Sequence, residues 1–271
     1  MSPDGGAAAL WLDARVVDRR ALDPATGLTW LALDATPWVE AAGQYVQVVT
    51  SDGAGGEVVR YVSLASAPGA RAELLVGRGE GRAEAGELSA LAVGDALRIS
   101  ARAAGRLTLR SVPTRPVLWL FAAGTGLAPL RAIVASGEAR ARFDRVVLVH
   151  SVRQARQLAF ADEFVAAHAA GWLTYVSAIT GTLPAHRASQ PSPSPSPVTL
   201  RGRIPAAIDD GTLERLVGAP LGPDVAAALI CGGSAMVGAT RQALERRGLH
   251  RHDAGREAPP ASPEGTIVTE W

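Results

Sequence analysis

VLWLFAAGTGLAP, at residues 117–129, joins an apolar run to a glycine turn, and a helical pattern begins directly after it at Leu130. This order predicts a buried strand, a tight turn and a helix with proline in its first turn. Glycine lets a ligand approach the backbone closely, and a helix start offers unpaired N–H groups to an anion. Ordinary helix capping explains the segment about as well, because the third glycine of a dinucleotide-binding fingerprint is absent.

Strand-like and helical patterns alternate after Pro116, which predicts βαβ units on a parallel sheet. We expect strands at 117–121, 145–150, 174–179 and 226–231, and helices at 130–135, 159–169, 203–216 and 236–247.

Before Pro116 the chain consists of short β-type runs broken by turns, which predicts a small antiparallel β-barrel. The expected strands are 11–18, 28–33, 44–50, 58–64, 72–77, 95–100 and 105–109. We therefore expect two domains, a barrel over residues 1–112 and an α/β domain over residues 113–271. Within the second, the alternating Pro and Ser at about 187–198 predict a solvated surface loop.

The composition excludes several classes of protein. The net charge of +1 disfavours a nucleic-acid partner, which would require a strongly basic face. Every basic residue is arginine, so the arginine count alone does not indicate phosphate binding. The single cysteine, Cys231, excludes an internal disulfide and any cysteine-held cluster.

The sequence contains no membrane or secretion signal that we recognise. No apolar run approaches the roughly 18 residues of a membrane span, and the N-terminus lacks the pattern of a signal peptide. The five histidines show no metal-binding spacing, so we predict no metal site. These features predict a soluble, cytoplasmic protein without a membrane or nucleic-acid partner, and we expect a monomer.

Three further segments carry residues suited to ligand chemistry. RYVSLASAP at 60–68 supplies an arginine, an aromatic ring and hydroxyls, although an ordinary edge strand fits equally well. Arg153 follows a predicted strand at the sheet edge where α/β proteins bind ligands, with a solvated loop as the alternative. Cys231 ends another strand before a glycine turn, where a small buried apolar residue is the simpler interpretation.

Together and in this order, these segments resemble the bacterial type of ferredoxin (flavodoxin)–NADP reductase, within the ferredoxin–NADP reductase superfamily. The resemblance runs from about Trp11 to Trp271. It is carried by RYVSLASAP (60–68), AAGTGLAP (122–129), LVHSVR (148–153) with LAF (158–160), LRGRIPAAIDDGTLERLVGAPL (200–221), LICGGSAM (229–236) and RRGL (246–249). It implies a barrel that holds FAD and a second domain that holds NADP(H), with the flavin at their junction.

The resemblance also implies roles for individual residues. Arg60 would pair with the flavin pyrophosphate, Arg153 and Arg203 would hold the 2′-phosphate of NADP, and Trp271 would cover the flavin. The implied catalytic residues are Ser63, Cys231 and Trp271. The implied FAD residues are Arg60, Tyr61, Val62, Ser63, Val76, Gly77, Thr125, Glu270 and Trp271. The implied NADP residues are Gly124, Gly126, Val152, Arg153, Ser177, Arg203, Cys231, Gly232 and Met236.

The chain departs from the family pattern at two informative positions. The family strand places tyrosine directly before its serine, whereas here Val62 stands there and the aromatic has moved to Tyr61. Neighbouring strand residues point to opposite faces, so Tyr61 cannot simply take over flavin stacking. Ala178 replaces a third phosphate arginine, which should weaken the preference for NADPH by roughly 1.5–3 kcal/mol.

The expected function is that of a NADPH-preferring, FAD-dependent ferredoxin–NADP reductase, with ferredoxin or flavodoxin as electron partner. Two alternatives remain open. One is the reductase component of an oxygenase. The other is a flavin-degenerate relative that binds a nucleotide or a partner without turnover, for which Val62 and Ala178 are the support.

Overall fold

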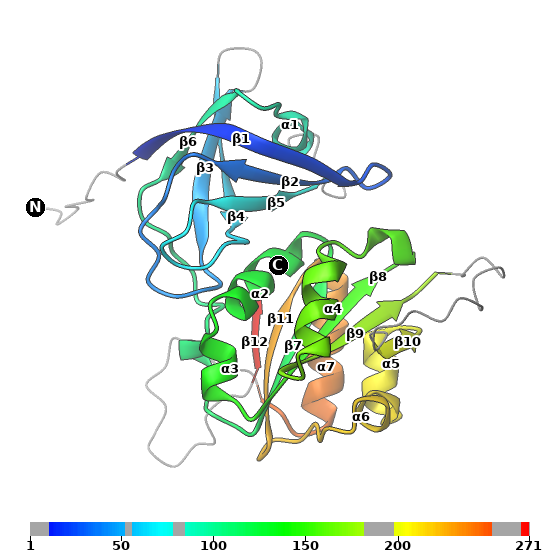
Figure 1. Cartoon of the computed structure of the whole chain (residues 1–271). Helices are drawn as coiled ribbons and strands as arrows, with labels where there is room; N and C mark the ends of the chain where they lie inside the picture. Colours follow the sequence, from blue (N-terminus) through cyan, green and yellow to red (C-terminus); the bar gives the residue numbers. More distant parts are fainter. Residues whose placement is uncertain (1–10, 52–55, 78–84, 182–197, 251–266, 271) are drawn as a thin grey trace, which may run out of the picture.

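The N-terminal half of the computed structural model is an antiparallel barrel (Figure 1). The structure describes residues 11–51, 56–77, 85–181, 198–250 and 267–270. The barrel strands are β1 (Trp11–Asp23), β2 (Leu28–Leu33), β3 (Tyr45–Ser51), β4 (Glu57–Ser63), β5 (Glu73–Val76) and β6 (Ala96–Ser100), in the order β4-β3-β6-β1-β2-β5. A bridge between Leu64 and Leu74 joins the two outer strands, β4 and β5, and thereby closes the sheet on itself.

Alternation of apolar and polar residues explains why these runs form a barrel. On β3, Val46 and Val48 are fully buried, whereas the alternate residues Tyr45 and Gln47 are partly exposed. The same alternation places Val62 of β4 in the barrel core and Tyr61 outside it. The sequence-based prediction of a barrel is therefore confirmed.

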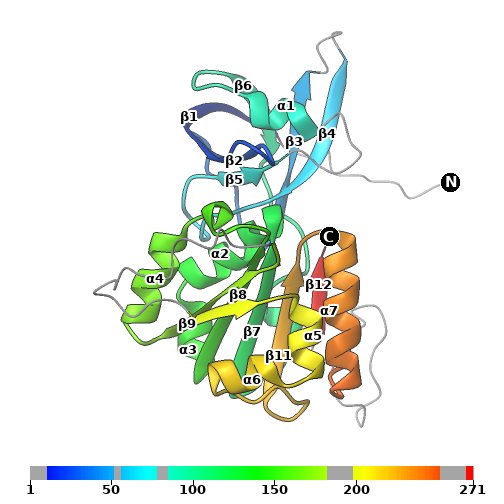
Figure 2. The same cartoon turned by 90° about the vertical axis from the view of Figure 1, so that its right-hand side faces the viewer.

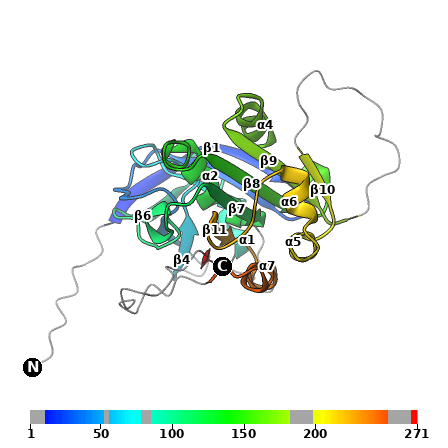
Figure 3. The same cartoon turned by 90° about the horizontal axis from the view of Figure 1, so that it is seen from below.

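The C-terminal half is a parallel sheet with helices on both faces (Figure 2). The strands are β7 (Val117–Ala123), β8 (Arg145–Val152), β9 (Leu173–Ile179), β10 (Val198–Arg201), β11 (Ala226–Cys231) and β12 (Ile267–Glu270), in the order β10-β9-β8-β7-β11-β12. The helices are α2 (Leu127–Ala135), α3 (Glu138–Arg142), α4 (Ala161–Ala169), α5 (Ile204–Asp209), α6 (Thr212–Val217) and α7 (Ser234–Arg246). Seen along the sheet, α2 and α4 lie on one side, and α5 and α7 lie on the other (Figure 3). The predicted α/β fold is confirmed.

Strand β7 is buried on both faces, which explains its unbroken apolar sequence. Trp119 and Phe121 pack into the cluster that contains α5 to α7. Leu118 and Leu120 pack on the other face, in a cluster that continues through α2 into Trp30 and other residues of the barrel. One apolar cluster therefore joins the two halves of the chain.

Several predicted elements differ from the structure. Residues 105–109 form no strand, and only Leu109 belongs to a short 3₁₀ turn, η1 (Leu109–Ser111). The helix predicted at 203–216 is broken into α5 and α6, because Gly211 adopts a left-handed conformation (φ 72°). Helices α1 (Ala85–Ala90) and α3 and strands β10 and β12 were not predicted. Of the predicted Pro/Ser loop, residues 187–197 lie outside the described residues, and Val198 already belongs to β10.

A buried histidine lies near the carboxyl end of strand β8. His150 on β8 is 1% exposed, and its Nδ1 atom lies 3.2 Å from the hydroxyl of Tyr175 on β9. Burial lowers the pKa of His150 to about 4 and raises the pKa of the Tyr175 phenol. The imidazole is therefore neutral at neutral pH and shares one hydrogen bond with the phenol.

We predict that His150 makes the fold less stable in mild acid. In the unfolded chain its pKa is near 6.5, so protons bind the unfolded state first as the pH falls from about 6.5 to about 4. Between pH ~7 and pH ~5 the free energy of unfolding should fall by about 2 kcal/mol from this residue alone. Urea unfolding of the native chain and of His150→Asn at both pH values measures this. An equally steep loss in the variant would contradict it.

Candidate functional site

Two glycine turns meet at the carboxyl edge of the parallel sheet. Strands β7 and β11 are parallel neighbours, with Ala122 beside Cys231, so both strands end at the same edge. A 3₁₀ turn, η2 (Gly124–Gly126), follows β7, and Cys231 and Gly232 end β11 and start the turn into α7. A Cβ atom on Gly126 would lie 2.3 Å from the carbonyl carbon and oxygen of Cys231 and 2.4 Å from the nitrogen of Gly232. Only glycine allows this backbone contact.

The second turn also packs closely on its neighbours. Gly232 has a φ of 154°, and a Cβ atom there would lie 2.6 Å from Cε of Met236 and 3.0 Å from the carbonyl oxygen of Ala123. Cys231 is 6% exposed, so its side chain borders the turns without standing free in solvent. The structure thus brings Gly124, Gly126, Cys231, Gly232 and Met236 together.

The end of a barrel strand reaches the same place. Val76 ends β5, and a Cβ atom on the next residue, Gly77, would lie 3.4 Å from Cγ2 of Thr125. Thr125 is exposed at the middle of its turn. Val76 is buried in the same barrel cluster as Val62. Val62 directly precedes Ser63, the last residue of β4. Residues of both halves therefore border one junction.

The arginine strand of the barrel has the face pattern that its sequence predicts. Tyr61 is 67% exposed and packs edge-on against Tyr45, with ring centroids 5.5 Å apart. Val62 points to the opposite face and is 9% exposed. The Nη1 atom of Arg60 donates a hydrogen bond to the Thr50 hydroxyl at 2.7 Å. The aromatic ring therefore does not lie on the face of Val62.

The two arginines predicted to hold a phosphate lie at the same edge of the sheet. Arg153 follows the end of β8, and its carbonyl accepts a hydrogen bond from Gly181, which follows β9. Arg203 is the N-cap of α5, directly after Gly202, whose N–H donates to Ile179 at the end of β9. The two backbones are thus about two strands, roughly 10 Å, apart, and both side chains are exposed.

Other predicted site residues lie differently. Ser177 is 4% exposed, and its hydroxyl lies 3.2 Å from that of Thr199 on the neighbouring strand β10. The carbonyl of Val152 accepts a hydrogen bond from Thr180. The backbone of Glu270 pairs with Cys231, next to the glycine turns. Trp271 lies outside the described residues. The roles of all these residues stay predictions.

Two features of the edge were not anticipated from the sequence. Strand β12 lies beside β11 and brings Glu270 next to Cys231, although only a run of β-branched residues near the C-terminus could have indicated a strand. Gly181 packs on Arg153, and a Cβ atom there would lie 2.6 Å from the Arg153 carbonyl oxygen. Its position after a strand and a threonine is the one signal for such a close approach.

The described residues show two further negative findings. Within them no group of His, Cys, Asp and Glu side chains is arranged to hold a metal ion. None of the helices in the described ranges is both long and apolar enough to cross a membrane.

Comparison with known proteins shows what the chain is similar to. The family model of the oxidoreductase NAD-binding domain matches residues 120–242, which begin in β7 and end in α7. The crystal structure of a ferredoxin NADP⁺ reductase from Neisseria gonorrhoeae with bound FAD and NADP superposes with a TM-score of 0.79 at 26% identity, covering 96% of this chain and 98% of that one. Over nearly its whole length the chain is therefore similar to a ferredoxin NADP⁺ reductase and shares the fold of that protein.

Curated ferredoxin–NADP reductases match this chain over part of their length. Ferredoxin–NADP reductase A of Sorangium cellulosum strain So ce56 is 31% identical over 178 residues, 62% of this chain and 59% of that protein. Flavodoxin/ferredoxin–NADP reductase of Escherichia coli strain K12 is 32% identical over 152 residues, 55% of this chain and 56% of that protein. The matched part thus spans just over half the length of these curated relatives.

The contact between the two glycine turns predicts a large cost for a single methyl group. Gly126 has an ordinary helical conformation (φ −63°), so Gly126→Ala adds no backbone strain, only the clash with Cys231. The free energy of unfolding should fall by about 1–3 kcal/mol, as for an overpacked core. Gly238→Ala in α7 is the control, since nothing lies within 4 Å of its Cβ position. Denaturant unfolding of both variants measures the difference, and equal stability would contradict the account.

Proposed function

We propose that the chain is an FAD-dependent, NADPH-preferring oxidoreductase that transfers electrons between NADP(H) and a ferredoxin or flavodoxin. The observation that carries the proposal is the junction itself, where Thr125 lies against the barrel residue Gly77 while Gly126 packs on Cys231 and Gly232. An FAD held by the barrel and a nicotinamide held by the glycine turns would meet there.

The barrel side of the junction suits a flavin, in part. Gly77, directly after the end of β5, borders Thr125 of the glycine turn, and Ser63 supplies a hydroxyl at the end of β4. Arg60 supplies a guanidinium for the pyrophosphate. Val62 offers a smaller apolar contact than an aromatic ring would, so we propose that the flavin is held less tightly than in relatives with tyrosine there.

The other side suits a nicotinamide nucleotide. The start of α2 supplies the positive end of a helix dipole. Arg153 and Arg203 stand at the edge of the sheet where they can bind a 2′-phosphate from two directions. Ala178 is fully buried in β9 and adds no charge, which supports a moderate preference for NADPH over NADH.

The protein's own contribution to the reaction is placement. A bound flavin supplies the hydride and single-electron chemistry. The glycine turns orient the nicotinamide, and the nearly buried side chain of Cys231 keeps water from its face. Thr125 and Ser63 would border a bound flavin from the two halves of the chain. Correct stacking of two rings is the main requirement for rapid hydride transfer.

The remaining assignments are proposals, of which only the electron partner comes from the resemblance. They comprise a ferredoxin or flavodoxin as partner, a cytoplasmic location, a monomeric state and a domain boundary near residue 112. The reductase component of an oxygenase is the second candidate function, because it would use the same junction with a different electron acceptor.

The flavin spectrum of the purified protein tests the proposed function. The protein, reconstituted with FAD if necessary, should show flavin absorption that NADPH bleaches under anaerobic conditions. Reoxidation by an added ferredoxin or flavodoxin then identifies the electron partner. If the chain cannot be loaded with FAD, or if NADPH does not reduce the bound flavin, the result would instead support the flavin-degenerate alternative.

Arg203→Ala tests the coenzyme site. Loss of one charge-assisted contact should raise the apparent KM for NADPH about tenfold or more and leave that for NADH nearly unchanged. Arg215→Ala, an exposed arginine on α6, is the matched control and should change neither value. Steady-state kinetics with both coenzymes measures the effect. Equal changes for NADPH and NADH would remove Arg203 from the 2′-phosphate site.

A further inference from the structure

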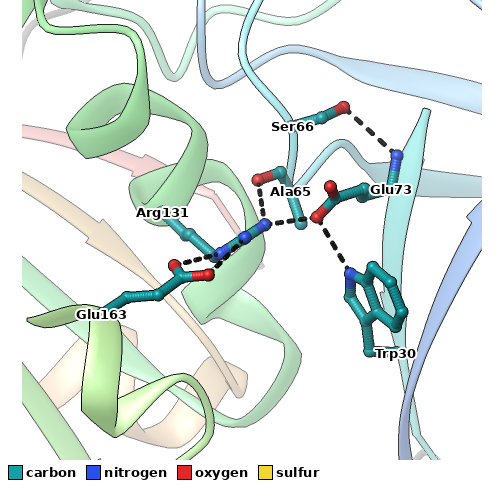
Figure 4. A network of polar contacts seen from close by, with 6 residues as sticks. All are labelled: Trp30, Ala65, Ser66, Glu73, Arg131 and Glu163. Carbon is teal, nitrogen blue, oxygen red and sulfur yellow. Dashed lines mark hydrogen bonds and ion pairs between the residues drawn. The ribbon is translucent and has the colours of Figure 1, made fainter. Parts of the chain in front are cut away.

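One arginine links the two halves of the chain through a polar network. Arg131 lies on α2, and its side chain is only 12% exposed. Its guanidinium reaches Glu163 of α4, Glu73 of β5 and the carbonyl of Ala65 (Figure 4). The network thus joins helices of the parallel-sheet half to a strand and a loop of the barrel.

The α/β half fixes the guanidinium in one orientation. Nε and Nη2 of Arg131 donate to the two carboxylate oxygens of Glu163 at 2.8 and 2.7 Å, a bidentate pair. The Arg131 Cζ atom also lies 4.2 Å from the ring centroid of Phe160. Phe160 has a φ of 54°, a conformation uncommon for a bulky residue, at the N-cap of α4. These contacts leave Nη1 pointing to the barrel.

The barrel presents an equally fixed acceptor. Nη1 donates to the carbonyl of Ala65 at 2.9 Å and to Oε2 of Glu73 at 2.5 Å. The same Glu73 oxygen accepts a hydrogen bond from the indole of Trp30 at 2.9 Å, and the Glu73 N–H donates to the Ser66 hydroxyl at 3.2 Å. Neither partner of the cross-junction contact can therefore turn freely.

The residues of this contact lie close in sequence to both parts of the proposed site. Arg131 belongs to the helix that begins directly after the glycine turn at Gly124–Gly126. Ala65 lies two residues beyond Ser63, at the end of β4. The contact therefore ties the segment that carries the proposed nicotinamide turn to the segment that carries the proposed flavin contact.

We propose that Arg131 is a positioning residue that sets the separation and orientation of the barrel relative to the glycine turns. This inference rests on the proposed function only where it concerns hydride transfer. Misplacement of reacting groups by about 1 Å can slow a reaction about 100-fold, so a contact that fixes the two halves relative to each other controls the rate without touching either ring.

Loss of the contact should loosen the junction without unfolding the chain. The apolar cluster that contains Trp30, Leu75, Leu127 and Leu130 still joins the halves. A second polar contact also remains, because Nε2 of Gln157 donates to Oδ2 of Asp23 at 2.8 Å. Hydrogen bonds from Thr26 and Gln157 outweigh the effect of burial and hold the pKa of Asp23 below its usual value.

Rapid-mixing kinetics with four variants tests the reaction part of the proposal. Arg131→Met and Glu73→Leu each remove the ion pair between Arg131 and Glu73, and Arg131→Lys restores part of it. Arg246→Met is the matched control, because Arg246 forms the same bidentate pair with Asp209 but within one half. Flavin reduction at saturating NADPH should slow about tenfold or more in the first two variants, with NADP⁺ affinity and FAD content unchanged. Arg131→Lys should recover part of the rate, and Arg246→Met should match the native chain.

A distance measurement without cofactors separates this proposal from the proposed function. Spin labels at Val93→Cys in the barrel and Leu216→Cys on α6, both exposed positions, report the distance between the halves in a Cys231→Ser background. The distance distribution should be narrow with Arg131 and broader with Arg131→Met. Equal widths, or an unchanged rate of flavin reduction in Arg131→Met, would overturn the positioning role. If NADPH does not reduce the flavin of the native chain, the proposed function is refuted. The distance distributions alone would then test the positioning role of Arg131.

Discussion

The backbone contact between Gly126 and the Cys231–Gly232 peptide is the constraint on which the site depends. It exists because β7 and β11 are parallel neighbours that end at one edge, so their following turns compete for the same space. A side chain at residue 126 would push the turns apart. The contact fixes where α2 begins, and the position of α2 in turn decides where Thr125 meets Gly77 and where Arg131 reaches the barrel.

The junction between the halves is more constrained than a typical contact between domains. Interfaces between domains of one chain are usually polar and allow relative motion. Here an apolar cluster runs from β7 through α2 into the barrel. Arg131 adds directional hydrogen bonds to partners in both halves. Dispersion contacts resist separation, whereas the hydrogen bonds of Arg131 resist rotation and sliding. Such a junction suits a reaction that depends on the alignment of two rings.

The fold could be predicted from the sequence because its signals are local. The glycine turn after a continuous apolar strand and the alternation of β3 and β4 depend on neighbouring residues alone. The same alternation gave the correct faces for Tyr61 and Val62. Arg131 could not be singled out, because all basic residues are arginine and its partners lie 32 to 66 residues away. Strand β12 was missed since its four residues form a strand only beside β11.

A crystal structure of the chain with FAD and NADP⁺ bound tests the central claim, that the two halves form one site at this junction. The account predicts a flavin ring in contact with Ser63 from the barrel and Thr125 from the parallel-sheet half. The nucleotide phosphate should lie between Arg153 and Arg203. A flavin that touches only barrel residues away from Thr125, or a nucleotide bound elsewhere than at the glycine turns, would contradict it.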